Sequence, residues 1–284
     1  MEMTCENICA LYKAQLNSFF TKREINELIA LAFFSSNNWN KVDVSLNKYY
    51  TLNENEVRFH KQVIGRLKAD EPIQYILGQT MFYDLVLNVK PGVLIPRPET
   101  EELVDWILES VDDGTSCLDI GTGSGCIALA LKSKTKNVNV TAIDSSKEAL
   151  LIAKENAKNL NLDVNFIEED IFNPRQIKKK WDFIISNPPY IPEYDKNMMD
   201  NNVLNYEPHN ALFVKDDTPL IFYKQIAKFS LKQLNKGGAV FFEIHHSMGL
   251  KIVELLASLG FVDVELKKDL QQKDRMVKAK LGLF

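Results

Sequence analysis

Apolar residues in the second half of the chain fall into short runs, and turn residues or amphipathic stretches separate one run from the next. The runs predict strands at 115–120, 138–143, 164–168, 182–186, 238–244, 261–267 and 275–283. Helices are expected between the first six strands. Alternating strands and helices favour an α/β fold with parallel strands and crossover helices. Because only a short loop separates the last two strands, we expect those two to be antiparallel.

The first part of the chain differs, because its apolar residues have the spacing of helices. Examples are Ile8, Leu11 and Leu16, and then Ile25, Leu28, Ile29, Ala32 and Phe33. Asn53, with Glu56 three residues later, predicts the capped start of a further helix. Residues 80–93 alternate between apolar and polar side chains, which predicts a short hairpin. We therefore expect a small N-terminal helical domain at 1–76, a β-hairpin linker at 77–95 and an α/β domain at 96–284.

Composition limits the classes of function. The chain has 284 residues, 45% of them apolar, and a formal net charge of -4, which gives no general attraction to nucleic acid. None of the four cysteines belongs to a C-x-x-C pair, so we expect no metal site. The N-terminal residues include Glu2 and Glu6 and no long apolar run. We therefore expect neither a signal peptide nor a membrane span, and hence a cytoplasmic location. The expected oligomeric state is a monomer.

A glycine-rich turn follows the first predicted strand of the α/β domain. It consists of Gly121, Thr122, Gly123, Ser124 and Gly125, and a helical run begins at Cys126. A strand, a glycine turn and a helix in this order let the backbone approach a nucleotide closely. The G-x-G-x-G spacing differs from the G-x-G-x-x-G of dinucleotide-binding proteins.

A carboxylate follows the next strand, at the same predicted edge of the sheet. Asp144 comes about 20 residues after the glycines, where an acid can bind ribose hydroxyls. Asp144 also precedes a helical pattern, so a role as the helix N-cap is an alternative.

The most specific motif is Asn187-Pro188-Pro189-Tyr190, directly after the strand at 182–186. The asparagine carboxamide can both donate and accept hydrogen bonds, and the two prolines fix φ and remove two N–H donors. The resulting stiff loop suits a planar –NH2 group. The Asn187 oxygen and a proline carbonyl would accept its two hydrogens, and Tyr190 would pack on its plane. Taken alone, the motif also fits an ordinary turn.

The glycine turn, Asp144 and the NPPY loop together resemble the Rossmann-like, seven-stranded S-adenosylmethionine-dependent methyltransferases. Further segments are similar to one family of that class, the peptide chain release factor glutamine N5-methyltransferases. They are PIQYILG at 72–78, LIPRPETE at 94–101, DIGTGSGCIA at 119–128 and YEPHNAL at 206–212. The resemblance runs from about residue 72 to the C-terminus. The chain departs from the family at His245-His246, where glycine and glutamine more often follow a glutamate like Glu243.

The resemblance implies the cofactor, S-adenosyl-L-methionine, and the residues that bind it. Gly121–Gly125 would hold the methionine part, and Asp144 would accept from the ribose hydroxyls. Asp170 and Phe172 would flank the adenine, although the class commonly has an aromatic residue where this chain has Ile171. Asn187 would face the methyl group.

The resemblance also implies the reaction. The substrate would be the glutamine of the Gly-Gly-Gln motif of bacterial peptide chain release factors. Asn187, Pro188, Pro189 and Tyr190 would form the catalytic loop. Because the helical domain contains no catalytic motif, we expect it to recognise the release factor outside the Gly-Gly-Gln loop.

Two other functions remain open from the residues alone. An NPPY loop does not distinguish an amide from an exocyclic base amine, so a DNA or RNA N-methyltransferase is one alternative. The net acidic composition disfavours it. A non-catalytic S-adenosylmethionine-binding module is the other, and the intact Asn187 disfavours that function.

Overall fold

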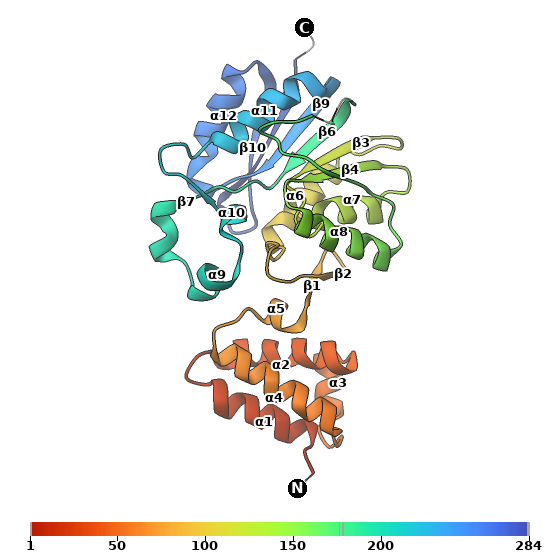
Figure 1. The fold of residues 1–284 in the computed structure, drawn as a ribbon, viewed down its shortest axis with the longest axis vertical. Coiled ribbons are helices and arrows are strands. Elements are labelled where there is room, and N and C mark those ends of the chain that lie inside the picture. Colours follow the sequence, from red (N-terminus) through yellow and green to blue (C-terminus); the bar gives the residue numbers. More distant parts are fainter. Residues whose placement is uncertain (1, 176, 178, 283–284) are drawn as a thin grey trace. The chain divides into compact units, whose positions relative to one another are not determined.

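The computed structural model describes residues 2–175, 177 and 179–282, and the chain divides into two units (Figure 1). The first unit contains the described chain up to Gln79 together with Asp200–Tyr206. The second contains Thr80–Met199 and the described residues from Glu207 onward. In the part of the chain that the structure describes, each helix is either too short or too polar to be a candidate membrane span.

The first unit is helical. Its elements are α1 (Cys5–Leu16), α2 (Lys22–Asn37), α3 (Lys41–Leu46), α4 (Glu54–Lys68), α5 (Ile73–Leu77) and α9 (Asn201–Tyr206). Capping boxes fix the starts of the first four, and the predicted pair is one of them. The Asn53 side chain accepts from the Glu56 amide, and the Glu56 side chain accepts from the Asn53 amide.

One polar ring lies inside the core of the helical unit. His60 of α4 is fully buried, and its Nδ1 atom is 3.1 Å from the Tyr12 hydroxyl. The Phe33 ring packs against it with 4.3 Å between centroids. Burial lowers the pKa of His60 to about 4, because an imidazolium would lose its hydration there.

The second unit is built on the predicted seven-stranded sheet, in the order β10-β11-β9-β6-β3-β4-β5. The strands are β3 (Ser116–Ile120), β4 (Asn139–Asp144), β5 (Asn165–Glu168), β6 (Trp181–Ser186), β9 (Leu234–Glu243), β10 (Phe261–Lys268) and β11 (Asp274–Leu281). Among the described strands of this sheet, only β11 runs antiparallel to its neighbours, which confirms the single reversed strand. Position 283 of the last predicted strand lies outside the described residues.

Helices cover both faces of the sheet (Figure 1). Successive side chains of a strand point to opposite sides, so its apolar residues pack against helices on both faces. Leu118 and Ile184 pack with α11 (Ile221–Gln233) and α12 (Gly249–Ser258). Their neighbours Cys117 and Ile185 pack with α6 (Pro98–Leu108) and α7 (Cys126–Lys134). Helix α8 (Lys147–Leu160) adds Ala157 to this second core.

The predicted hairpin is present as β1 (Gln79–Phe82) and β2 (Leu85–Asn88). It packs on the second core through Phe82 and Leu87. The long connection from β6 to β9 contains further short elements. They are β7 (Ile191–Pro192), the 3-10 helix η1 (Glu193–Met198), α10 (His209–Leu212) and β8 (Phe213–Val214). A second 3-10 helix, η2 (His246–Met248), follows β9.

One predicted helix is wrong. The described residues between β5 and β6 (169–175, 177, 179 and 180) contain turns and no helix. The Asp170 carboxylate accepts from the Phe172 amide at 2.9 Å, and the Asp170 carbonyl accepts from the Asn173 amide. Pro174 follows, with a ring that cannot donate to a helical ladder. These local bonds form a turn in place of a crossover helix.

Candidate active site

A cavity of about 320 Å³ lies where the parallel strands β3, β4 and β6 end. Its volume lies within the range of small-molecule sites. Segments that the sequence singled out separately meet in its wall. The predicted site residues that line it are Gly121, Gly123, Asp144, Asp170, Phe172, Asn187, Pro188 and Pro189. The other four, Thr122, Ser124, Gly125 and Tyr190, are not among its lining residues.

The glycines of the turn have two different structural roles. Gly121 and Gly123 line the cavity with φ values of +74° and +55°. A Cβ atom added to either would have no protein atom within 4 Å, so the turn leaves an open cradle there. Gly125, with φ +85°, precedes α7 instead. A Cβ on Gly125 would lie 3.1 Å from Leu129 Cδ1 and 3.2 Å from Ala153 Cβ, so this glycine lets α7 and α8 pack closely.

Thr122 and Ser124 anchor the turn by hydrogen bonds to residues outside the cavity lining. The Thr122 hydroxyl donates to the carboxylate of Asp119 at 2.6 Å, and both residues are buried. Burial raises the pKa of Asp119 to about 7. The Ser124 carbonyl accepts from the Asn156 side chain at 3.0 Å. These contacts fix the path of the backbone on the side away from the cavity.

Asp144 connects the glycine turn to the start of α8. One carboxylate oxygen accepts from the Gly123 amide and the other from the Ser146 amide, each at 2.9 Å. The N-cap of α8 is Ser146, whose hydroxyl accepts from the Ala149 amide. Asp144 is therefore not the N-cap, and each of its oxygens keeps capacity for another donor in the cavity. Burial raises the pKa of Asp144, and these hydrogen bonds oppose the shift.

The turn after β5 gives the cavity an apolar wall. Ile171 and Phe172 both line it, so the structure brings both candidates for contact with a flat ring to the same place. The Phe172 ring meets Phe222 of α11 edge to face, with centroids 5.1 Å apart. Gln225, on the same helix, donates to the Ile171 carbonyl at 2.8 Å.

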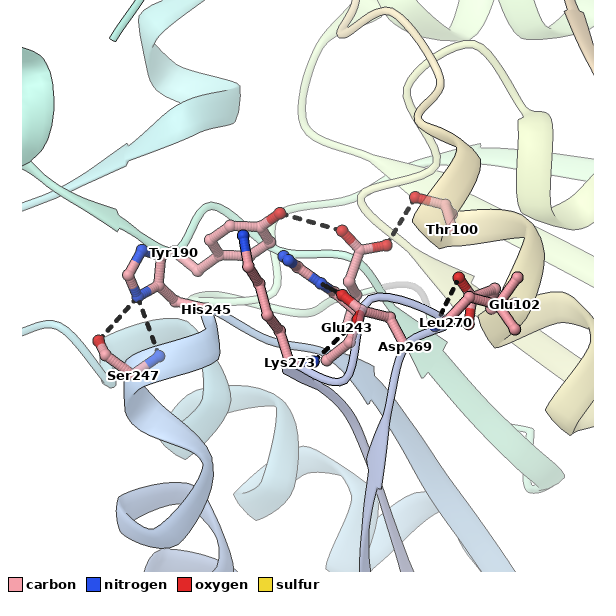
Figure 2. A network of polar contacts seen from close by, with 10 residues as sticks. Thr100, Glu102, Tyr190, Glu243, His245, Ser247, Asp269, Leu270 and Lys273 are labelled. Atoms are coloured by element: carbon pink, nitrogen blue, oxygen red, sulfur yellow. Dashed lines mark hydrogen bonds and ion pairs between the residues drawn. The ribbon is translucent and has the colours of Figure 1, made fainter. Parts of the chain in front are cut away.

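The NPPY loop divides between the cavity and the protein interior. Asn187, Pro188 and Pro189 line the cavity, and Asn187 Nδ2 donates to the Thr100 hydroxyl at 3.3 Å. The Tyr190 hydroxyl instead donates to Glu243 Oε1 at 3.0 Å (Figure 2). Burial raises the pKa of Tyr190, so this phenol is a neutral hydrogen-bond donor.

The two histidines after β9 do not belong to the lining of the cavity. His245 Nδ1 lies 2.8 Å from the Ser247 hydroxyl (Figure 2), and its Nε2 lies 3.7 Å from Asp195 Oδ2. Among the described residues, no three histidine, cysteine or acidic side chains form a possible metal site.

Sequence reasoning missed several lining residues. They are in the loop before α6, in α10 and in α11: Gly92, Val93, Leu94, Asn210, Ala211, Phe222 and Ile226. Leu94, Asn210 and Ala211 lie inside family-like segments, which was the available signal. Phe222 and Ile226 gave no signal beyond the apolar spacing of an ordinary helix.

Comparison with known proteins gives a family-model match at residues 100–205, to the methyltransferase small domain. A solved structure, the 16S rRNA N2 G1207 methyltransferase of Thermus thermophilus with S-adenosylmethionine and guanosine, has a TM-score of 0.53 at 16% identity. The alignment covers 72% of this chain and 50% of that one. This likeness concerns the fold alone.

Two curated relatives extend over nearly the whole chain. The release factor glutamine methyltransferase of Flavobacterium psychrophilum is 39% identical, over 97% of this chain and 99% of the relative. That of Bacteroides thetaiotaomicron is also 39% identical, over 96% and 98%. The fold is that of an S-adenosylmethionine-dependent methyltransferase. Within that class, the chain belongs to the release factor glutamine methyltransferase family.

Proposed function

We propose that the protein transfers a methyl group from S-adenosylmethionine to the side-chain amide nitrogen of the glutamine in the Gly-Gly-Gln motif of a bacterial peptide chain release factor. The observation that carries the proposal is the position of Asn187-Pro188-Pro189 in the wall of the cavity that Gly121, Gly123 and Asp144 also line. Family membership supports the choice of a glutamine amide over a base amine.

The lining residues fit the cofactor. The open cradle at Gly121 and Gly123 has room for the methionine part, and the Asp144 oxygens can accept from ribose hydroxyls. Asp170, Ile171 and Phe172 would surround the adenine. When bound, the cofactor supplies a methyl group on a positively charged sulfur, which is a strong electrophile.

The residues of the NPPY loop would orient the glutamine amide. Amide nitrogen is a weak nucleophile, so alignment of the attacking atom is the main task of the protein. Asn187 Oδ1 and the Pro188 carbonyl would accept the two N–H groups and stabilise the partly positive nitrogen of the transition state. Transfer of the methyl group to the nitrogen would leave the cofactor as a neutral thioether and release one amide proton to solvent water. Glu207 is a poor candidate to accept it, because this carboxylate is already paired with Arg97.

The helical unit would recognise the body of the release factor. Three exposed apolar side chains on and just after α3, those of Val42, Leu46 and Tyr49, support this role. The double variant Leu46→Ser, Tyr49→Ala should raise KM for the intact factor at least about tenfold. It should leave KM for a short Gly-Gly-Gln peptide unchanged. Equal KM changes for both substrates would remove this surface from the proposal.

We also propose that the protein works as a monomer in the cytoplasm and has no nucleic-acid partner. The bacterial release factor methyltransferases among its relatives and the net charge of -4 support this. A single monomeric mass by light scattering and no retention on DNA or RNA are the expected results.

The decisive experiment combines the purified protein, S-adenosylmethionine and a bacterial release factor, with peptide mass spectrometry as the readout. One methyl group should appear on the Gly-Gly-Gln glutamine. The Asn187→Ala variant should lose this activity and keep most of its affinity for the cofactor in calorimetry. Cofactor binding without any methylation of the factor would reject the proposed substrate. Methylation of nucleic acid and not of the factor would support the alternative function, that of a DNA or RNA N-methyltransferase.

A further inference from the structure

A chain of hydrogen bonds leads from Asn187 in the cavity wall to the buried carboxylate of Glu243. Asn187 Nδ2 lies 3.3 Å from Thr100 Oγ1, and the Thr100 hydroxyl donates to Glu243 Oε2 at 2.6 Å. The other oxygen of Glu243 accepts from the Tyr190 hydroxyl at 3.0 Å. Figure 2 shows Glu243 between Thr100 and Tyr190. Thr100 and Glu243 are only 2% and 1% exposed, so the bond between them is shielded from water, while Asn187 and Tyr190 at the two ends are half-buried.

The direction of each bond follows from the chemistry of Glu243. An ionised carboxylate only accepts hydrogen bonds, so the single hydroxyl proton of Thr100 is committed to it. Towards Asn187, Thr100 can then offer only a lone pair. The Asn187 carboxamide must therefore donate to Thr100 through its NH2 group, and its Oδ1 atom remains available to accept from another group.

Both oxygens of the Glu243 carboxylate accept a hydrogen bond, one from the Thr100 hydroxyl and one from the Tyr190 hydroxyl. Burial raises its pKa, while the hydrogen bonds from Thr100 and Tyr190 and the positive charge of Arg275 oppose the shift. Glu99 is the other charged group that acts on it, and it acts in the same direction as burial. Arg275 is itself held in place by Asp269, at 3.1 Å.

We propose that Glu243 is a positioning residue that acts through Thr100 to fix the orientation of the Asn187 carboxamide, so that its oxygen faces the amide group to be methylated. This inference rests on the proposed function and deepens it. The glutamine amide presents N–H donors, so a carboxamide turned the other way would meet it with a second donor. One acceptor-only group in the interior thus selects which end of Asn187 meets the substrate.

The Glu243→Gln variant tests the proposal with almost no change in shape. The new amide can donate to Thr100 Oγ1, which frees the Thr100 hydroxyl to donate to Asn187 Oδ1 and turns the carboxamide over. Turnover (kcat) should fall by about 10- to 100-fold, the scale of losing one oriented transition-state contact. The Kd for S-adenosylmethionine should stay within about threefold, because the cradle at Gly121 and Gly123 is untouched.

A second pair of variants separates positioning from general support of the fold. Thr100→Val removes the hydroxyl at similar size and should reproduce the loss in kcat, whereas Thr100→Ser should keep most of the turnover. Because Glu243 acts through Thr100, adding Glu243→Gln to Thr100→Val should cause little further loss. Glu102→Gln is the matched control. Glu102 lies on α6, as Thr100 does, but its carboxylate accepts from the Leu270 amide, so this variant should leave kcat unchanged.

The results separate failure of this inference from failure of the proposed function. If the unmodified protein does not methylate a release factor, the proposed function fails first. If it does, full activity of Glu243→Gln or Thr100→Val overturns the positioning role. Additive losses in the double variant also overturn it. The positioning role is also overturned if Glu243→Gln weakens cofactor binding or lowers thermal stability while its kcat stays unchanged.

Discussion

The guanidinium of Arg97 lies 2.6 Å from Glu207 Oε1, and this ion pair joins two segments that are 110 residues apart in the chain. The second oxygen of Glu207 accepts from the Ile95 amide at 3.2 Å. The Glu207 side chain is 1% exposed and that of Arg97 is 33% exposed. Leu94 on one segment and Asn210 on the other line the cavity, so the pair holds two parts of its wall together.

Removal of Arg97 should therefore destabilise the protein strongly. Arg97→Ala leaves a buried carboxylate without its counter-ion, which costs about 3 kcal/mol of unfolding free energy. Chemical denaturation measures this loss. The exposed pair of Lys41 and Glu27 provides the control, and Lys41→Ala should cost less than about 1 kcal/mol. Equal losses in the two variants would show that the Arg97–Glu207 pair adds no more than a surface contact.

The open cradle makes a separate prediction for Gly123. Gly123→Ala places a methyl group at the wall of the cavity, at a backbone φ of +55°. The strain costs roughly 1–2 kcal/mol of stability, and the lost space should weaken S-adenosylmethionine binding about tenfold or more. Calorimetric titration gives the affinity. Gly114→Ala, at φ +85° with no atom within 4 Å and outside the cavity lining, should show the strain and no change in affinity.

The affinity for S-adenosylmethionine should depend on the charge of Asp144, even when the shape of the side chain is retained. In Asp144→Asn one of the two accepting oxygens becomes an NH2 group, which then faces the amide of Gly123 or Ser146. We expect S-adenosylmethionine affinity to fall by roughly 10- to 100-fold, about 1.4–2.7 kcal/mol. Asp182→Asn is the control, because Asp182 also accepts from a backbone amide, that of Ser116, but near the opposite ends of β3 and β6. Equal affinity losses in both variants would mean that the effect is structural.

The sequence predicts where the site lies, because a parallel sheet brings the ends of its strands to one edge. Gly121, Asp144 and Asn187 each follow a recognisable apolar strand, and those strands, β3, β4 and β6, are neighbours in the sheet. Local pattern and residue type are sufficient for this result. The reversed strand was also predictable from the local sequence, because a short loop cannot connect parallel neighbours.

Contacts between distant segments limit the rest of the prediction. The partner of Tyr190 is Glu243, 53 residues away, and no local pattern shows that the tyrosine hydroxyl lies behind the cavity. Phe222 reaches the cavity only because α11 packs beside the turn at Phe172. The missing helix after β5 is a local error, since Asp170 and Pro174 favour a turn in a segment where the alternation of strands and helices predicted a crossover helix.

His60 predicts how the stability of the protein depends on pH. Its pKa in the folded state is about 4, below the value of about 6.5 expected in an unfolded chain. The unfolded state therefore binds the proton more readily, and stability falls as pH decreases from about 6.5 towards 4. This group alone should remove about 2 kcal/mol of unfolding free energy between pH 7.5 and pH 5. His60→Gln, whose side-chain amide can still form a hydrogen bond with the Tyr12 hydroxyl, should lose this part of the pH dependence. His209→Gln is the matched control and should keep it, because His209 is exposed. Urea denaturation of the three proteins at both pH values decides the question, and an unchanged pH dependence in His60→Gln would assign the effect to another group.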